Sequence, residues 1–116
     1  MTEIYTSTFG DYWGADRLDI TSIAKSLFSP PWDLVKRYKS GEIDDEKYKI
    51  EYTALMRTSY KHNTHLWKKH LEAKRITLVC HCKPGAFCHR VLLAKILEKV
   101  GSRYGGARYI GEIDAG

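Results

Sequence analysis

The three cysteines of this chain and two of its five histidines lie in one short stretch, CHCKPGAFCHR, at residues 80–90. Thiolates and imidazoles bind metal ions, and thiolates also act as nucleophiles. The Pro84–Gly85 turn in the same stretch precedes a predicted helix, and backbone N–H groups at a helix start bind anions. The stretch therefore fits three kinds of site: an anion cradle, a zinc site and a catalytic thiol.

The anion cradle is our leading interpretation, because of where the stretch lies. The apolar run ITLVC, at 76–80, predicts a buried strand, and CHRVLLAKILEKVG, at 88–101, predicts a helix with an apolar face. The backbone amides of residues 85–89 would then lie at a helix start and carry partial positive charge. Lys83 and Arg90 would add full positive charges, so we expect a phosphate or carboxylate ligand here. The stretch has neither the Walker pattern nor the dinucleotide-binding glycine pattern.

Zinc binding is the second interpretation. Cys80, Cys82 and Cys88, together with either His81 or His89, supply four ligands of the types that zinc prefers. Cysteine pairs in structural zinc sites are usually separated by about two to four residues, however, whereas Cys-x-Cys at the end of a strand splays its thiols. We therefore predict no metal at this site and keep zinc as an alternative.

Nucleophilic catalysis is the third interpretation. Cys88 lies at the start of the predicted helix, beside His89 and Arg90. A helix start and a neighbouring cation both favour the thiolate, which is the reactive form of cysteine. Cys88 and His89 are therefore the candidate catalytic residues.

The rest of the chain predicts alternating strands and helices. The β-branched and aromatic residues of 3–9 predict a strand that ends near Thr6 or Ser7. The other expected elements are a short strand at 18–21, a short helix within 29–41, a helix with Asp44 as its N-cap, a helix capped by Asn63 or Thr64, and a last strand at 108–113. The expected buried faces of the two middle helices are Tyr48, Tyr52 and Leu55 in one and Leu66, His70 and Ala73 in the other.

The strand, helix and strand of residues 76–113 predict a right-handed crossover between parallel strands. We therefore expect a small Rossmann-like three-layer α/β domain with a mostly parallel central sheet. Ligands of such sheets bind beyond the carboxyl ends of the strands, and Cys80 ends the most apolar strand. Thr6 and Ser7, at the end of the first strand, are expected to face the same site.

Length and composition limit the class of protein. A chain of 116 residues with 43% hydrophobic and 28% charged residues fits a single α/β domain over residues 1–116. The apolar runs are too short to cross a membrane and no leader segment is visible, so we expect a cytoplasmic protein without membrane contact. The formal charge of +5 favours an anionic partner, with nucleic acid ranked below a phosphate-bearing small molecule.

The segment ITLVCHCKPGAFCHRVLLAKIL resembles the C-terminal signature of the uncharacterised family called domain of unknown function 488, which also occurs in phages. Members show a buried strand ending in cysteine, a variable loop, then Cys-His-Arg and two apolar residues. The positions that fall on this pattern are Cys80, Cys88, His89, Arg90, Leu92 and Leu93. The resemblance implies a Rossmann-like fold with Cys-His-Arg at the carboxyl edge of the sheet, and makes Asp19 the counterpart of the family's aspartate. It implies no particular reaction.

We predict a small protein that binds a nucleotide-like or phosphate-bearing ligand at the carboxyl edge of its sheet, without a cofactor. The aromatic side chains of Tyr12, Trp13 or Trp32 could stack a base. The alternatives are a cysteine-dependent enzyme acting on a nucleotide or nucleoside-like substrate, a zinc-binding module, and a phage inhibitor that contacts another protein. The candidate ligand-binding residues are Thr6, Ser7, Asp19, Cys80, Cys82, Lys83, Gly85 and Arg90.

Overall fold

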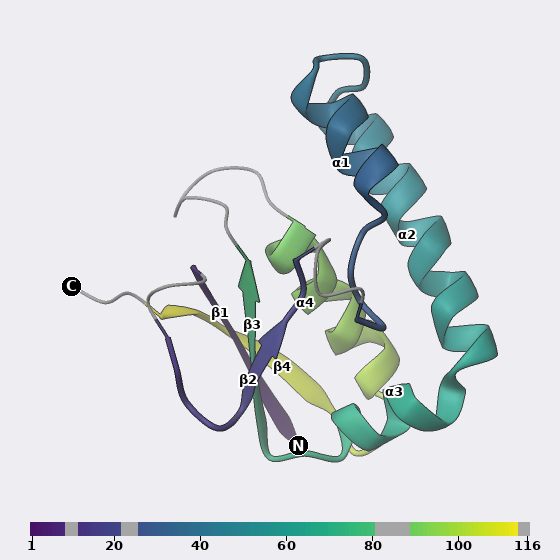
Figure 1. Ribbon diagram of the computed structural model, residues 1–116. Coiled ribbons are helices and arrows are strands. Elements are labelled where there is room, and N and C mark those ends of the chain that lie inside the picture. The colour runs from purple at the N-terminus through teal and green to yellow at the C-terminus, as the bar shows by residue number, and fades with distance from the viewer. Residues whose placement is uncertain (9–11, 22–25, 81–88, 114–116) are drawn as a thin grey trace.

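The computed structural model describes residues 1–8, 12–21, 26–80 and 89–113 (Figure 1). Its four described strands form one sheet in the order β2-β3-β1-β4, and every neighbouring pair is parallel. The strands are β1 (Thr2–Thr8), β2 (Arg17–Asp19), β3 (Arg75–Cys80) and β4 (Ala107–Ile113). The predicted α/β class with a parallel sheet is confirmed, and the apolar run at 76–80 forms an interior strand as expected.

The described helices lie on one side of this sheet (Figure 1). They are α1 (Trp32–Lys39), α2 (Asp45–His62), α3 (Thr64–Leu71) and α4 (His89–Gly101). The crossovers from β2 to β3 and from β3 to β4 both run in the same direction across the sheet, so right-handed connections place their helices on the same face. Helix α4 packs on β1, β3 and β4, and α2 and α3 pack on α4.

The opposite face of the sheet, called the open face below, is covered in part by residues 12–16. Thr77 on β3 donates through its hydroxyl to Asp16 Oδ2 at 2.6 Å, and its backbone N–H donates to the Asp16 carbonyl at 3.0 Å. The guanidinium of Arg75 also donates to Asp16 Oδ2, at 3.0 Å. Among the described residues, the third layer of the domain is therefore this short segment rather than a helix.

Strand β4 contains an irregularity that sets which side chains share a face. Ile4 on β1 pairs with Tyr109, but the next residue, Tyr5, pairs with Gly111, so Ile110 is an extra residue. Such a bulge shifts the alternation of side chains by one position. Glu112 then pairs with Thr6 and lies on the helix-covered face together with Tyr109. Gly111 has a φ of 153°, a conformation that side-chain-bearing residues rarely adopt.

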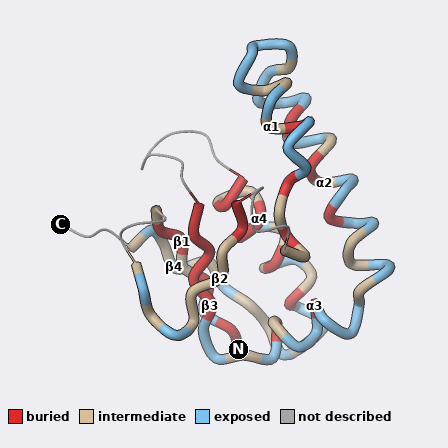
Figure 2. The backbone as a smooth tube through the Cα atoms, viewed as in Figure 1, coloured by how far each residue is buried: buried red, intermediate tan, exposed pale blue. Residues whose placement is uncertain are grey.

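The hydrophobic core lies between the sheet and the helices (Figure 2). Tyr52 and Trp67 are completely buried, and the Trp67 ring packs edge-on against Phe28 with their centroids 4.8 Å apart. The Tyr52 hydroxyl donates to the Phe28 carbonyl at 2.7 Å, which satisfies a polar group inside the core.

The observed helix boundaries are close to the predicted ones, but the buried faces of two helices differ from those expected. Asp44 caps α2 as predicted, its Oδ1 accepting from the Lys47 N–H at 2.8 Å. Leu55 is 39% exposed, and Met56, which continues the four-residue spacing of the buried tyrosines, packs in the core instead. Leu66 is likewise exposed, because α3 turns Trp67 and Leu71 inward.

In the part of the chain that the structure describes, no helix combines the length and apolarity needed to cross a membrane.

Candidate functional site

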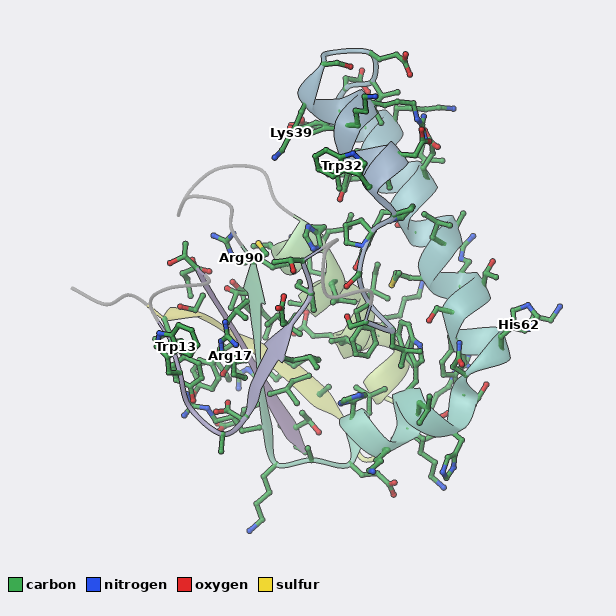
Figure 3. All side chains as sticks on the ribbon, viewed as in Figure 1. Trp13, Arg17, Trp32, Lys39, His62 and Arg90 are labelled. Carbon is green, nitrogen blue, oxygen red and sulfur yellow. The ribbon has the colours of Figure 1, made fainter. Side chains whose placement is uncertain are left out.

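A charged cluster lies inside the carboxyl edge of the sheet, where β3 ends and α4 begins (Figure 3). The Arg90 guanidinium binds Glu112 through two bonds, Nε to Oε1 at 3.1 Å and Nη2 to Oε2 at 2.9 Å. Its Nη1 donates to Cys80 Sγ at 3.2 Å. The Arg90 side chain is only 2% exposed and that of Glu112 is 27% exposed. This cluster therefore joins a thiol, a buried cation and a carboxylate from three different elements.

The cluster depends on the bulge in β4. If residues 109–112 alternated regularly, without a bulge at Ile110, Glu112 would lie on the open face, away from Arg90. With it, Glu112 lies on the same face as the first turn of α4, where it meets the guanidinium in the forked geometry that arginine and a carboxylate prefer. Removing Glu112 would leave the buried Arg90 cation without its carboxylate partner, so the pair fixes the orientation of the guanidinium.

His89 occupies the buried side of the same helix start. Its Nε2 lies 2.7 Å from the carbonyl oxygen of Ile20, just after β2. Because a carbonyl oxygen only accepts, Nε2 carries the hydrogen of the neutral ring. Burial lowers the pKa of His89, and the opposing effects of Cys80 and of the Ile20 carbonyl do not offset this. His89 is therefore a neutral imidazole with a defined tautomer at pH 7.

The structure separates the two hydroxyl residues predicted at the end of the first strand. Thr6 lies on the helix-covered face beside Glu112 and shares a 2.7 Å hydrogen bond with the Tyr109 hydroxyl. Ser7 is the next residue of the strand and therefore lies on the open face, where its hydroxyl donates to the Ile113 carbonyl at 2.9 Å. Of the two, Thr6 is the one that belongs to the cluster around Arg90.

Asp19 lies at the carboxyl end of β2, and its Oδ1 accepts from the Thr21 N–H at 2.9 Å. It pairs in register with Val79 on β3. Its carboxylate therefore shapes the turn after β2.

The other predicted site residues lie outside the described residues: Cys82, Lys83, Gly85 and Cys88. The same is true of His81, which belongs to the alternative zinc set. The described residues contain no group of three or more histidine, cysteine, aspartate or glutamate side chains arranged to hold a metal ion. This finding does not include Cys82 and Cys88, so the alternative zinc set remains a prediction.

The aromatic residues proposed to stack a base lie in two different places. Trp32 is 58% exposed at the start of α1, with Lys39 Nζ 5.8 Å from its ring centroid. Trp13 is 69% exposed beside Arg17, on the side of the sheet away from the helices (Figure 3). Tyr12 donates to the Asp16 carboxylate on that same side.

Glu112 and Tyr109, the two β4 residues that complete the cluster, were not predicted from the sequence. The signal available was Gly111, because an isolated glycine within a strand often marks a bulge. In a regular strand, residues three positions apart lie on opposite faces. A bulge between Tyr109 and Glu112 places them on the same face. The partner across the sheet, Thr6, could then have been proposed from the parallel pairing of the strands.

The arrangement supports two kinds of chemistry. A cation fixed at a helix start favours an anion bound beyond the edge of the sheet. A guanidinium N–H on a thiol sulfur favours the thiolate, whereas burial of the sulfur opposes it. Anion binding and thiol chemistry thus share Arg90 as the central residue.

Comparison with curated proteins and with solved structures gave no match. A protein-family profile, DUF488-N3a, described as the active DUF488-N3 subclade, matches residues 16–101. The matched range includes β2, β3, all the described helices and the Cys80–Arg90 contact, and it ends before β4 and Glu112. Because this range is most of the chain, the protein belongs to the DUF488 family, within the subclade described as active.

Proposed function

We propose that this protein binds a nucleotide-like or phosphate-bearing ligand at the carboxyl edge of its sheet. The observation that carries the proposal is the placement of Arg90, a buried cation held by Glu112 in the first turn of α4. This position lies beyond the end of an interior parallel strand, where α/β proteins usually bind ligands. The basic balance of the chain, +5 overall, favours the same class of ligand.

The proposed roles divide between the described cluster and residues 81–88, which the sequence predicts to form a loop. Glu112 orients the guanidinium, and Thr6 and Tyr109 provide hydroxyl groups beside Glu112. The loop between β3 and α4 would supply Lys83 and the backbone amides near Gly85, as the sequence predicts. The ligand would therefore contact an edge of fixed geometry, held by the Arg90–Glu112 pair, on one side and the loop on the other.

A screen of thermal stability tests the proposal. The panel contains nucleoside mono-, di- and triphosphates, cyclic nucleotides and inorganic phosphate. A ligand at one hundred times its Kd adds about 2.7 kcal/mol to the free energy of unfolding, which raises Tm by several degrees. We expect at least one nucleotide to give such a shift and Arg90→Lys to abolish it, because lysine lacks the bidentate fork.

Arg57→Lys is the matched control. It makes the same chemical change at an exposed position of α2. The control should keep the full ligand-induced shift. The proposal is wrong if no compound of the panel raises Tm, or if Arg90→Lys keeps the shift of the unmodified protein.

Thiol catalysis on the bound ligand is the second candidate function. It is favoured by the Arg90 Nη1 contact with Cys80 Sγ and by the description of the subclade as active. The described cluster contains Cys80, and Cys88 lies outside the described residues, so both thiols need testing. The test follows the ligand found in the screen by mass spectrometry, with Cys80→Ser and Cys88→Ser compared separately.

Catalysis by a thiol predicts that one serine variant still binds the ligand but forms no product. Product formed at the unmodified rate by both variants would exclude a thiol mechanism and leave the binding proposal intact. Native mass spectrometry of the same samples also counts bound zinc, which tests the alternative zinc set.

A further inference from the structure

The open face of the sheet carries a second cluster of cations, far from the site just described. Arg75 on β3 and Arg108 on β4 both pair in register with Glu3 on β1, so the three residues form a row across the sheet. Neighbouring strands lie about 4.8 Å apart, which spaces the two arginine positions by roughly 10 Å. Lys74 lies immediately before β3 at the same end of the sheet.

Two of these cations are unneutralised within the described part of the chain. Arg108 and Lys74 are exposed and make no ion pair or hydrogen bond with any described side chain. Arg75 is held by Asp16 at 3.0 Å, yet its side chain is still 41% exposed. The amino-terminal half of the open face is therefore positively charged overall, with Glu3 as its exposed carboxylate.

Aromatic rings lie between and beside these cations. The guanidinium carbon of Arg75 is 4.1 Å from the Tyr5 ring centroid, and that of Arg17 is 4.2 Å from the Trp13 ring centroid. Cation–π contacts of this kind hold a guanidinium in place without neutralising its charge. Trp13 remains 69% exposed, so much of its ring is available to a partner.

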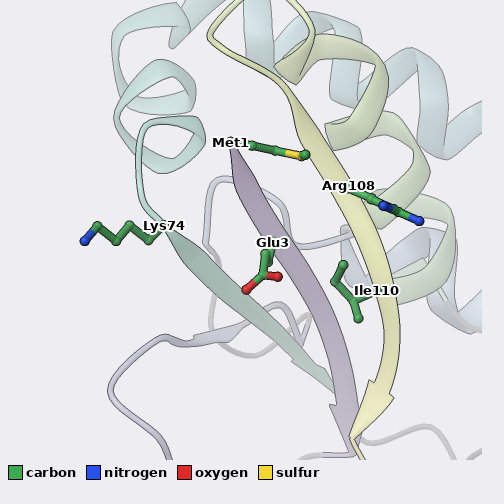
Figure 4. Close-up of a pocket in the computed structure, with 5 residues that line it drawn as sticks. All are labelled: Met1, Glu3, Lys74, Arg108 and Ile110. Atoms are coloured by element: carbon green, nitrogen blue, oxygen red, sulfur yellow. The ribbon is translucent and has the colours of Figure 1, made fainter.

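A shallow pocket of about 370 Å³ lies on the same face (Figure 4). Glu3 and Ile110 project from adjacent strands toward the viewer, with the helices behind the sheet. The lining combines two apolar side chains, one carboxylate and two cations: Met1, Ile110, Glu3, Lys74 and Arg108. Such a surface can cover a flat, weakly polar ring while the cations bind phosphates at its rim.

We propose that the open face binds single-stranded nucleic acid. Lys74, Arg75 and Arg108 bind phosphates, and the exposed ring of Trp13 stacks a base, as in other sheet surfaces that bind single strands. A duplex fits less well, because its bases are stacked on one another and cannot reach the exposed ring. This surface is separate from the carboxyl-edge site, so the proposal stands or fails independently of the proposed function.

The experiment measures fluorescence anisotropy of labelled 20-nucleotide oligo-dT and oligo-U at several salt concentrations. The variant is Lys74→Ala/Arg108→Ala, which removes two exposed side chains that make no ion pair or hydrogen bond with the described residues. Binding to a single strand loses about 0.7 in the slope of log K against log salt for each phosphate contact removed, so the double variant should lose about 1.4. Trp13→Ala should weaken binding about tenfold.

Lys61→Ala/Lys68→Ala is the matched control, because it removes the same charge from exposed positions of α2 and α3. The control should keep the affinity and salt slope of the unmodified protein. Equal losses in the two double variants would overturn the proposal, since the binding would then depend only on net charge. A duplex of the same length that binds as tightly, or polyglutamate that competes equally well, would also overturn it, the latter indicating an acidic protein partner.

Discussion

The two faces of the sheet differ in whether their arginines are buried and paired or exposed. On the helix-covered face, Arg90 is buried and both oxygens of Glu112 accept from it. On the open face, Arg108 is exposed and has no charged partner among the described residues. A buried cation must be paired because it has lost its hydration, whereas an exposed cation can keep water until a ligand replaces it. The first arrangement gives a fixed geometry, and the second gives a surface ready for anions.

Strand β4 contributes to both faces, and its bulge decides which residue goes to which. Arg108 and Ile110 lie on the open face, while Tyr109 and Glu112 lie on the helix-covered face. A single extra residue thus allows one strand to build part of a buried charge cluster and part of an exposed basic surface. The comparison can be tested by changing one face while the other is kept.

Removing the carboxylate of the buried pair should have the largest effect. Glu112→Ala leaves Arg90 buried without its partner, and we expect the free energy of unfolding to fall by about 3 kcal/mol. Urea denaturation measures the change. Glu42→Ala is the control, because Glu42 is 63% exposed and lies 4.0 Å from Arg37, so its loss should cost less than about 0.5 kcal/mol.

The double variant Arg90→Met/Glu112→Leu separates the cost of an unpaired buried charge from the other contacts of the cluster. Replacing a buried ion pair by apolar side chains is often nearly neutral, so the double variant should be more stable than Glu112→Ala alone. A double variant less stable than the single one would show that the cluster stabilises the fold through contacts other than the ion pair.

The bulge is the next element to change. Gly111→Ala places a side chain at a φ of 153°, and we expect a loss of about 1–3 kcal/mol together with weaker fixation of Glu112. Deleting Ile110 in this background removes the extra residue, so alanine could adopt an ordinary strand conformation and Glu112 would stay on the same face as Thr6. Recovery of stability by the deletion, measured by urea denaturation, tests the bulge directly. Failure to recover would contradict this account of Gly111.

The sequence predicted where the helices and strands lie better than it predicted which of their residues are buried. The unbroken apolar run of β3 and the capping residue Asp44 are local signals, so both elements were placed correctly. The phase of a buried face depends on what packs against it, which is why Leu66 was chosen although Trp67 is the residue that meets Phe28.

The candidate site shows the same limit more clearly. Arg90 was predicted from its place at the helix start, but its pairing with Glu112 joins residues 22 positions apart and depends on the register of β4 against β1. Thr6 and Ser7 were expected to face one site, yet strict alternation along a strand sends neighbours to opposite faces. The basic open face was not predicted, because Lys74 and Arg75 are adjacent in the sequence but only the pairing of β3 and β4 with β1 brings Arg108 into the same row.

The pH dependence of stability tests whether the buried histidines stay neutral in the folded protein. Burial lowers the pKa of His89 below the usual value of 6.5, and burial also lowers that of His70. The unfolded chain therefore takes up protons near pH 6.5 that the folded chain does not, so the free energy of unfolding should fall as pH decreases below about 6.5. His89→Gln should flatten this dependence, measured by urea denaturation between pH 7 and 5, while His62→Gln, on the exposed surface of α2, should not. An unchanged dependence in His89→Gln would mean that His89 does not stay neutral in the folded protein.

The smallest effect on stability is expected for the open face. Arg108→Ala and Lys74→Ala remove exposed cations that bond to no described side chain, so each should change the free energy of unfolding by less than about 0.5 kcal/mol. Arg90→Ala, the same substitution on the other face, should cost several times more, because it leaves Glu112 and Cys80 without their donor. A large loss in Arg108→Ala would assign the open-face cations to folding. A small loss of stability, combined with weakened binding of oligonucleotides, would mean that these charges contribute to binding and not to folding.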